Sequence, residues 1–238
     1  RARSKILQAK ERAEMAVERL KELDQLKSEF LSTVSHELRT PLASITGFTT
    51  TMLENPDLDG EIQNEFLGII HRESNRLAHI IEDLLDFARI EQGAMKIDWL
   101  YTDLVALIRD VIELMSHRFE EKRIGLKADF EQDSLCLHLD PTRIGQVVKN
   151  LLSNAMKFTD PGGKVTVVLK PGPTSVVLEV SDSGVGIPPE ALDNVFERFY
   201  RVPEHTMMAA GTGLGLPICK RIVELHHGVV SIRSTVGR

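Results

Sequence analysis

The chain has 238 residues, of which 42% are hydrophobic and 27% charged, and this composition is typical of a folded protein with one or two domains. The formal net charge of -6 gives no basic surplus, so binding to nucleic acid through phosphate neutralisation is disfavoured. No apolar stretch is long enough to cross a bilayer. The two cysteines, Cys136 and Cys219, match no metal or redox spacing, so we expect buried, reduced thiols in a reducing compartment.

The first 25 residues are rich in Glu, Lys, Arg, Ala and Leu. Small or apolar residues recur there at spacings of three and four, namely Ile6, Ala9, Ala13, Ala16, Leu20 and Leu23. This spacing predicts a dimeric coiled coil over residues 1–25. The alternative is a single solvated amphipathic helix, because the seam is short and rich in alanine.

Two long helices are predicted next, over residues 26–53 and 61–92, and the turn-forming segment 55–60 separates them. Each helix carries an apolar face, so the pair should form a hairpin with one broad apolar side. Two such hairpins can bury these sides against each other in a four-helix bundle. We therefore expect a homodimer.

His36 lies on the polar side of the first of these helices. At about 100° per residue, the apolar residues from 30 to 48 share an arc of about 120°, and His36 falls nearly opposite. Glu37 is its neighbour and Thr40 lies one turn on, so we expect an exposed imidazole with a carboxylate and a hydroxyl beside it. Pro41 removes a backbone hydrogen bond and should bend the helix there. The alternative for His36 is an ordinary solvated histidine.

The pattern changes after Gly93 from long helices to mixed elements. A helix is predicted over residues 102–120. Apolar runs with strand character lie near residues 123–130, 135–139, 164–170, 174–181 and 228–233, with helical stretches between them. These elements predict an α/β sandwich, and their irregular alternation makes a doubly wound parallel sheet the weaker alternative.

A helix opened by Asp140 and Pro141 carries the first polar constellation of this region. One stripe of about 80° contains Arg143, Gln146, Asn150, Asn154 and Lys157. Asparagine is a poor helix former, yet it offers neutral oxygen ligands and amide donors. Together with an ammonium group, such ligands suit a magnesium-bound phosphate chain. The alternative is a solvated polar face.

Three further segments have patterns suited to a ligand. In the turn 182–188, an aspartate at a strand end is followed by two glycines, which lets a flat ligand approach the backbone. The run 211–217 feeds glycines into a helix N-terminus, whose free N–H groups can bind phosphate oxygens. Segment 196–201 precedes an irregular stretch, 202–210, that we interpret as a mobile lid. Taken singly, each could be a plain turn or surface loop.

Segment 30–42, Phe-Leu-Ser-Thr-Val-Ser-His-Glu-Leu-Arg-Thr-Pro-Leu, closely resembles the phosphoacceptor motif of sensor histidine kinases. Segments 150–159, 182–188, 196–201 and 211–216 resemble, in this order, the N, G1, F and G2 boxes of the catalytic domain of that family, whose fold is similar to that of gyrase-type ATPases. Five ordered motifs make coincidence improbable. The resemblance covers nearly all of the chain from about Leu26 onward.

The resemblance implies that His36 attacks the γ-phosphate of ATP with Glu37 as general base, and that Thr40 orients a water when the partner is dephosphorylated. It implies that Asn150 ligates Mg2+ and that Asp182 binds the adenine amine. The phosphate contacts would come from Asn154, Lys157 and Arg201 and from the backbone at Gly211, Gly213 and Gly215. The resemblance also places Phe158, Gly184, Gly186, Thr212 and Leu214 at the nucleotide.

The implied partner is an aspartate on the receiver domain of a response regulator, with no membrane contact by this fragment. The expected parts are a coiled-coil signalling helix (1–25), a dimerisation and histidine phosphotransfer domain (26–93) and a catalytic domain (94–238). We expect a cytoplasmic fragment of a longer chain, whose membrane anchoring stays open. Two departures from the family pattern are Pro217 and the lack of a final strand. The rival functions are a clamp ATPase, which has no need of His36, and a non-catalytic dimeric scaffold.

Overall fold

The computed structural model describes residues 2–198, 200–202 and 212–237. The chain forms two compact units, Arg1–Glu82 and Asp83–Arg238, and the boundary between them falls inside a helix. Each unit is described by itself below.

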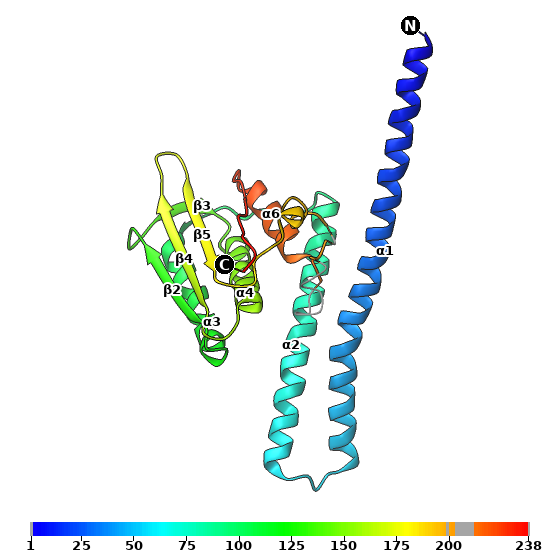
Figure 1. Ribbon diagram of the computed structural model, residues 1–238. Coiled ribbons are helices and arrows are strands. Elements are labelled where there is room, and N and C mark those ends of the chain that lie inside the picture. The colour runs from blue at the N-terminus through cyan, green and yellow to red at the C-terminus, as the bar shows by residue number, and fades with distance from the viewer. Residues whose placement is uncertain (1, 199, 203–211, 238) are drawn as a thin grey trace. The chain divides into compact units, whose positions relative to one another are not determined.

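The first unit is built from two long helices, α1 (Ala2–Glu54) and α2 (Gly60–Glu91), of which α2 continues into the second unit (Figure 1). The segments expected as a coiled coil and as a first bundle helix form one continuous helix, which runs through Pro41. The two helices meet through apolar side chains, since the rings of Phe48 and Phe66 lie 4.8 Å apart. Among the described helices, none combines the length and the apolar content that a membrane span requires.

The second unit contains two small sheets. Strands β1 (Leu100–Asp103) and β3 (Cys136–Leu139) pair antiparallel, with Leu100 opposite Leu139. The other sheet has the order β2-β4-β5. Its strands are β2 (Gly125–Phe130), β4 (Lys164–Pro171) and β5 (Val176–Asp182); β2 is parallel to β4, and β4 is antiparallel to β5.

Three longer helices complete this unit, namely α3 (Leu104–Glu121), α4 (Pro141–Phe158) and α6 (Gly215–Leu225), together with the short helix α5 (Pro189–Leu192). Helices α3 and α4 pack against the β2-β4-β5 sheet, and α6 packs against α4 (Figure 1). Alternate residues of β4 are buried, as expected for a strand with one face on a core. The core combines that face with apolar residues of α3 and α4, including Ile108, Phe119, Val148, Leu152, Val165 and Val167. The predicted α/β sandwich is therefore confirmed.

Asp103 joins the end of β1 to the start of α3. Its Oδ1 accepts hydrogen bonds from the backbone N–H of Val105 at 3.0 Å and of Leu135 at 3.1 Å, so one carboxylate caps the helix and fixes the neighbouring loop. Hydrogen bonds to the charged form, first of all the one from Leu135, lower the pKa of Asp103. The sequence did not predict β1, because Thr102 and Asp103 were assigned to the start of the helix expected over residues 102–120, and the two residues before them were assigned to no element.

The prediction of a strand over residues 228–233 is wrong. Residues 228–235 form no ladder, although Arg233 lies 3.8 Å from Glu179 of β5. The hydrogen bonds near the end of the chain go elsewhere: Ile187 donates its N–H to Ser234 Oγ, and Gly237 donates to Val185 O. This segment is therefore held by the loop after β5 rather than by the edge of the sheet.

The two cysteines should differ strongly in reactivity. Cys219 on α6 is fully buried, as expected, and burial raises its pKa to about 12, whereas the expected burial of Cys136 on β3 is wrong, because its side chain is exposed. Because the thiolate is the reactive form, a thiol reagent at pH 8 should label one cysteine in the native chain and two after unfolding. The control is Cys136→Ser, which should show no native labelling. Rapid native labelling of Cys219 would contradict the buried position.

Candidate active site

His36 lies on α1 and is exposed, as the sequence predicts. Its helical turn is hydrogen-bonded to Thr40, whose Oγ1 donates to the backbone oxygen of His36 at 3.1 Å. Pro41, the next residue, is buried. The imidazole therefore faces solvent from a helix whose opposite side is packed.

Glu37 does not have the exposed position that the sequence predicts. Its side chain is 11% exposed, and its Oε2 accepts a hydrogen bond from Arg76 Nη2 of α2 at 2.8 Å. The step of about 100° from His36 to Glu37 turns the carboxylate toward α2, where Arg76 compensates its charge. The sequence did not single out Arg76, because a basic residue on an exposed helix face carries no distinctive signal.

Helix α4 begins as the sequence predicts. Asp140 is its N-cap, with Oδ1 accepting from the N–H of Arg143 at 3.0 Å, and Pro141 is its first residue. The N–H of Asp140 donates to Nε2 of His226 at 3.0 Å, and this ties the start of α4 to the end of α6. The two helices are therefore held side by side by a bond at one end.

Asn150 lies where α4 and α6 approach each other. Its Nδ2 is buried and, within the described part of the chain, makes no hydrogen bond of ordinary length; its polar neighbour is the Cys219 thiol of α6. A Cβ added at Gly215, the first residue of α6, would lie 3.9 Å from this amide. A buried donor without a partner costs stability, so an unpaired amide beside a helix N-terminus is what a ligand-binding residue would show. Asn154 and Lys157 follow on the same helix and are half-buried.

The loop after β5 packs against the end of α4. Asp182 is exposed at the end of the strand, and its Oδ1 accepts from the N–H of Gly184 at 2.9 Å. Val185 donates its N–H to Phe158 O at 3.2 Å. Gly186 has a φ of 73°, which favours glycine, and a Cβ there would lie 2.3 Å from Thr235 O. A side chain at Gly184 or at Gly186 would therefore clash with neighbouring backbone atoms.

The glycine run before α6 meets the segment expected to precede the lid. Gly213 has a φ of 73°, and a Cβ there would lie 3.1 Å from Cγ of Arg201. Thr212 and Leu214 are buried. The expected lid covers residues 202–210, of which residues 203–210 lie outside the described residues, as does Gly211.

These approaches bring together most of the predicted nucleotide-site residues of the second unit. The end of α4 meets the loop after β5, the middle of α4 meets the start of α6, and Arg201 meets Gly213. Lys157 Nζ lies 5.5 Å from the centroid of the Phe158 ring, so a cation also lies at this end of α4. An amide, a carboxylate, two cations and a glycine-fed helix N-terminus match the groups of a nucleoside triphosphate.

Gly184→Ala should disrupt this site. The new Cβ would lie 2.4 Å from Phe158 O and 2.7 Å from Asp182 Oδ1, so the loop or α4 must shift, at a cost of about 1–3 kcal/mol in the free energy of unfolding. Urea unfolding together with nucleotide binding would measure both effects. Gly145→Ala is the matched control, because its Cβ would make an ordinary 3.7 Å contact with Leu107 and should stabilise α4 by about 0.5–1 kcal/mol. Equal stability of the two variants would contradict the close packing.

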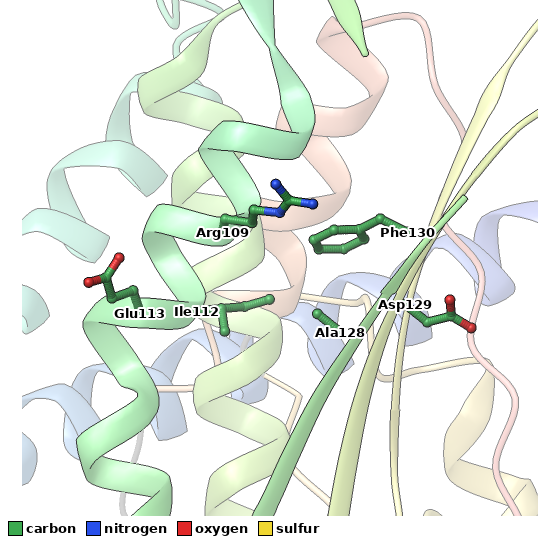
Figure 2. Close-up of a pocket in the computed structure, with 6 residues that line it drawn as sticks. All are labelled: Arg109, Ile112, Glu113, Ala128, Asp129 and Phe130. Carbon is green, nitrogen blue, oxygen red and sulfur yellow. The ribbon is translucent and has the colours of Figure 1, made fainter. Parts of the chain in front are cut away.

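A separate cavity of about 400 Å³ lies between α3 and β2. It is lined by Arg109, Ile112, Glu113, Ala128, Asp129 and Phe130, and the guanidinium of Arg109 lies 5.7 Å from the ring centroid of Phe130 (Figure 2). This cavity contains none of the site residues predicted from the sequence.

Two family models match the chain. The His Kinase A (phospho-acceptor) domain matches residues 26–93, and the histidine kinase-, DNA gyrase B- and HSP90-like ATPase matches residues 139–238. The second match implies ATP binding. Together the two matches contain His36, the whole of α4 and the described glycine segments.

Curated relatives match over most of the chain. Hybrid signal transduction histidine kinase D of Dictyostelium discoideum is 37% identical over 226 residues, which is 91% of this chain and 14% of the relative. Sensor protein SrrB of Staphylococcus aureus (strain NCTC 8325 / PS 47) is 34% identical over 218 residues, again 91% of this chain and 37% of the relative. The chain therefore spans only a part of the length of these relatives.

Solved structures share the fold. Acinetobacter baumannii histidine kinase AdeS superposes with a TM-score of 0.65 at 22% identity, covering 85% of this chain and 92% of that one. Full-length ShkA in complex with AMPPNP has a TM-score of 0.65 at 30% identity, covering 90% and 43%. Histidine kinase ThkA in complex with response regulator protein TrrA has a TM-score of 0.60 at 28% identity, covering 87% and 57%.

Proposed function

Because the chain belongs to the sensor histidine kinase family of two-component signalling, we propose that it transfers the γ-phosphoryl group of ATP to His36 and then to an aspartate of a response regulator. One joint observation supports this proposal most strongly. An exposed histidine on α1 occurs in the same chain as Asn150, whose Nδ2 is buried beside the start of α6 without a hydrogen bond of ordinary length to the described residues.

The catalytic step joins an imidazole nitrogen of His36 to the γ-phosphorus while the bond to the β,γ-bridging oxygen breaks and ADP leaves. The imidazole proton passes to Glu37 as general base. Arg76 holds that carboxylate through a 2.8 Å hydrogen bond. The solvent-facing position of His36 leaves it open to the catalytic domain and to a receiver domain in turn.

The nucleotide is bound by the second unit. Asp182 at the end of β5 accepts from the adenine amine, and the loop glycines, Gly184 and Gly186, let the base approach the backbone. Phosphate oxygens are bound by Asn154, Lys157 and Arg201 and by the backbone at Gly211, Gly213 and Gly215. Phe158, Thr212 and Leu214 complete the site. The ShkA structure, whose complex contains AMPPNP, supports this assignment by its similarity over 90% of the chain.

Asn150 would hold Mg2+, which when bound neutralises phosphate charge. Among the described residues, no group of three or more His, Cys, Asp or Glu side chains could hold a metal ion. The amide oxygen of Asn150 fits a hard cation that takes most of its ligands from phosphates and water. The unpaired Nδ2 of the same amide supports a bound ligand at this position.

The active form would be a homodimer through a four-helix bundle. Several apolar side chains of α1 and α2 are exposed in the single chain, including Leu31, Leu42, Leu67 and Leu85. Such side chains are typical of a surface that a second copy covers. Of the parts proposed from the sequence, 1–25, 26–93 and 94–238, the second contains both helices that one chain gives to this bundle.

The proposed partner is a response regulator, as in the ThkA complex with TrrA. Thr40, one turn beyond His36, would orient a water for dephosphorylation of that regulator. Localisation of the fragment in the cytoplasm, with any membrane anchor elsewhere in a longer chain, is part of the same proposal.

The test is to incubate the purified chain with Mg2+ and γ-labelled ATP. We expect label on the protein that is acid-labile and alkali-stable, as a phosphoramidate is. ATP turnover without protein label would instead favour the clamp ATPase. If the chain shows no ATP turnover and takes up no label, the result would favour the non-catalytic dimeric scaffold.

A further inference from the structure

A buried carboxylate near the end of α2 has no part in the mechanism above. Asp86 Oδ2 accepts hydrogen bonds from Arg143 Nη1 at 2.7 Å and from Gln146 Nε2 at 2.8 Å, both on α4. The Asp86 side chain is 7% exposed and that of Arg143 is 18% exposed. Arg143 also donates to Gln146 Oε1 at 3.0 Å, so the three side chains close a ring of hydrogen bonds. All three belong to the second compact unit.

Stability alone does not explain this ring. Two charges removed from water lose hydration, and apolar side chains of similar volume often stabilise a protein as well as a buried ion pair does. A charged ring differs from an apolar contact in being directional. Since Arg143 and Gln146 lie three residues apart on one face of α4, bonds from both to one oxygen fix the rotation of α4 about its axis.

That rotation decides where Asn150 points. Asn150 lies four residues after Gln146, on the same face of α4, and its amide lies next to Gly215. No hydrogen bond of ordinary length reaches the buried Nδ2 of Asn150 from the described residues, and its polar neighbour is the Cys219 thiol of α6, which is a weak acceptor. The position of the amide depends on the helix that carries it, and Asp86 anchors this helix one turn away.

A second ion pair ties the end of α2 to the other side of the site. Glu91, the last residue of α2, pairs with Arg198 at 2.5 Å. Arg198 lies three residues before Arg201, which meets Gly213. The last turns of α2 therefore contact two of the three segments that carry the proposed phosphate-binding residues, namely α4 and the segment 196–201.

We propose that Asp86 is a positioning residue, which sets the rotation of α4 so that Asn150 is presented to the nucleotide. The inference rests on the proposed function and adds a route of regulation. Helix α2 is continuous from Gly60 to Glu91 and crosses the boundary between the two units. A shift of α2 thus alters the rotation of α4 and with it the nucleotide affinity. By linkage, nucleotide binding alters the position of α2.

The experiment compares Asp86→Asn with the matched control Glu82→Gln, one turn earlier on α2. Glu82 has a side chain that is 71% exposed. The binding of a non-hydrolysable ATP analogue with Mg2+ is measured by titration, alongside thermal unfolding and the labelling kinetics. Asp86→Asn should weaken analogue binding about tenfold and raise the KM for ATP by a similar factor, with kcat within about twofold. Glu82→Gln should match the parent.

Unchanged analogue affinity in Asp86→Asn, even with a lower melting temperature, would overturn the inference, because a purely structural role changes the folded fraction and not the affinity. If Asp86→Asn does not fold, Gln146→Met removes the donor to Asp86 and the acceptor for Arg143 while the Asp86–Arg143 pair remains, and about threefold weaker binding is expected. Unchanged affinity in that variant would likewise overturn the inference. A parent chain that binds the analogue but takes no label would refute the proposed function alone.

Discussion

The His36→Gln chain should take up no label from γ-labelled ATP, to below about 1% of the parent, because glutamine offers no nucleophilic nitrogen to the phosphorus. His36 is exposed on α1, so the substitution removes no packed side chain. Nucleotide affinity should stay at the parental level, since the proposed nucleotide site lies in the other unit.

The matched control is His79→Gln on α2. His79 is a second histidine of the same unit with a side chain that is 56% exposed, and its ring lies 3.4 Å from Glu82. Its replacement should leave labelling unchanged. If His36→Gln keeps its acid-labile label, the phosphoryl acceptor is another histidine. If both variants lose the label, the substitutions have damaged the helical hairpin.

Features with a local cause were predictable from the sequence. The N-cap at Asp140, the helix after the glycine run and the strands β2 to β5 follow from capping residues, glycine positions and apolar alternation. The exposed position of His36 follows from helical periodicity. Each of these signals is contained within a few residues.

Features set by contacts between distant segments were not predictable. Glu37 is buried because Arg76, 39 residues away, compensates its charge. Residues 228–233 are apolar enough for a strand, but their neighbours bond to the loop after β5. Asp86 carried one usable signal, because it interrupts the apolar run 84–88, and an acid within such a run needs a partner. The sequence could not show which residues that partner would be.

Asn150→Ala should abolish phosphorylation while leaving the fold at least as stable. Loss of a magnesium ligand should weaken binding of Mg-ATP about 100-fold or more, and labelling of His36 should fall in parallel. The Nδ2 of Asn150 is buried without a partner among the described residues, and such a donor costs about 1–3 kcal/mol. Its removal offsets the small cavity that alanine leaves. Titration with nucleotide and thermal unfolding would measure the two quantities.

These two quantities separate a binding residue from a structural one. A packing role for Asn150 predicts a lower melting temperature with little change in nucleotide affinity, which is the opposite result. The variant also complements His36→Gln, because one lacks the proposed metal ligand and the other the acceptor. In heterodimers of the two, label on the Asn150→Ala chain would show that the phosphoryl group crosses the dimer. If neither chain of a verified heterodimer takes up label, the phosphoryl group is transferred within one chain.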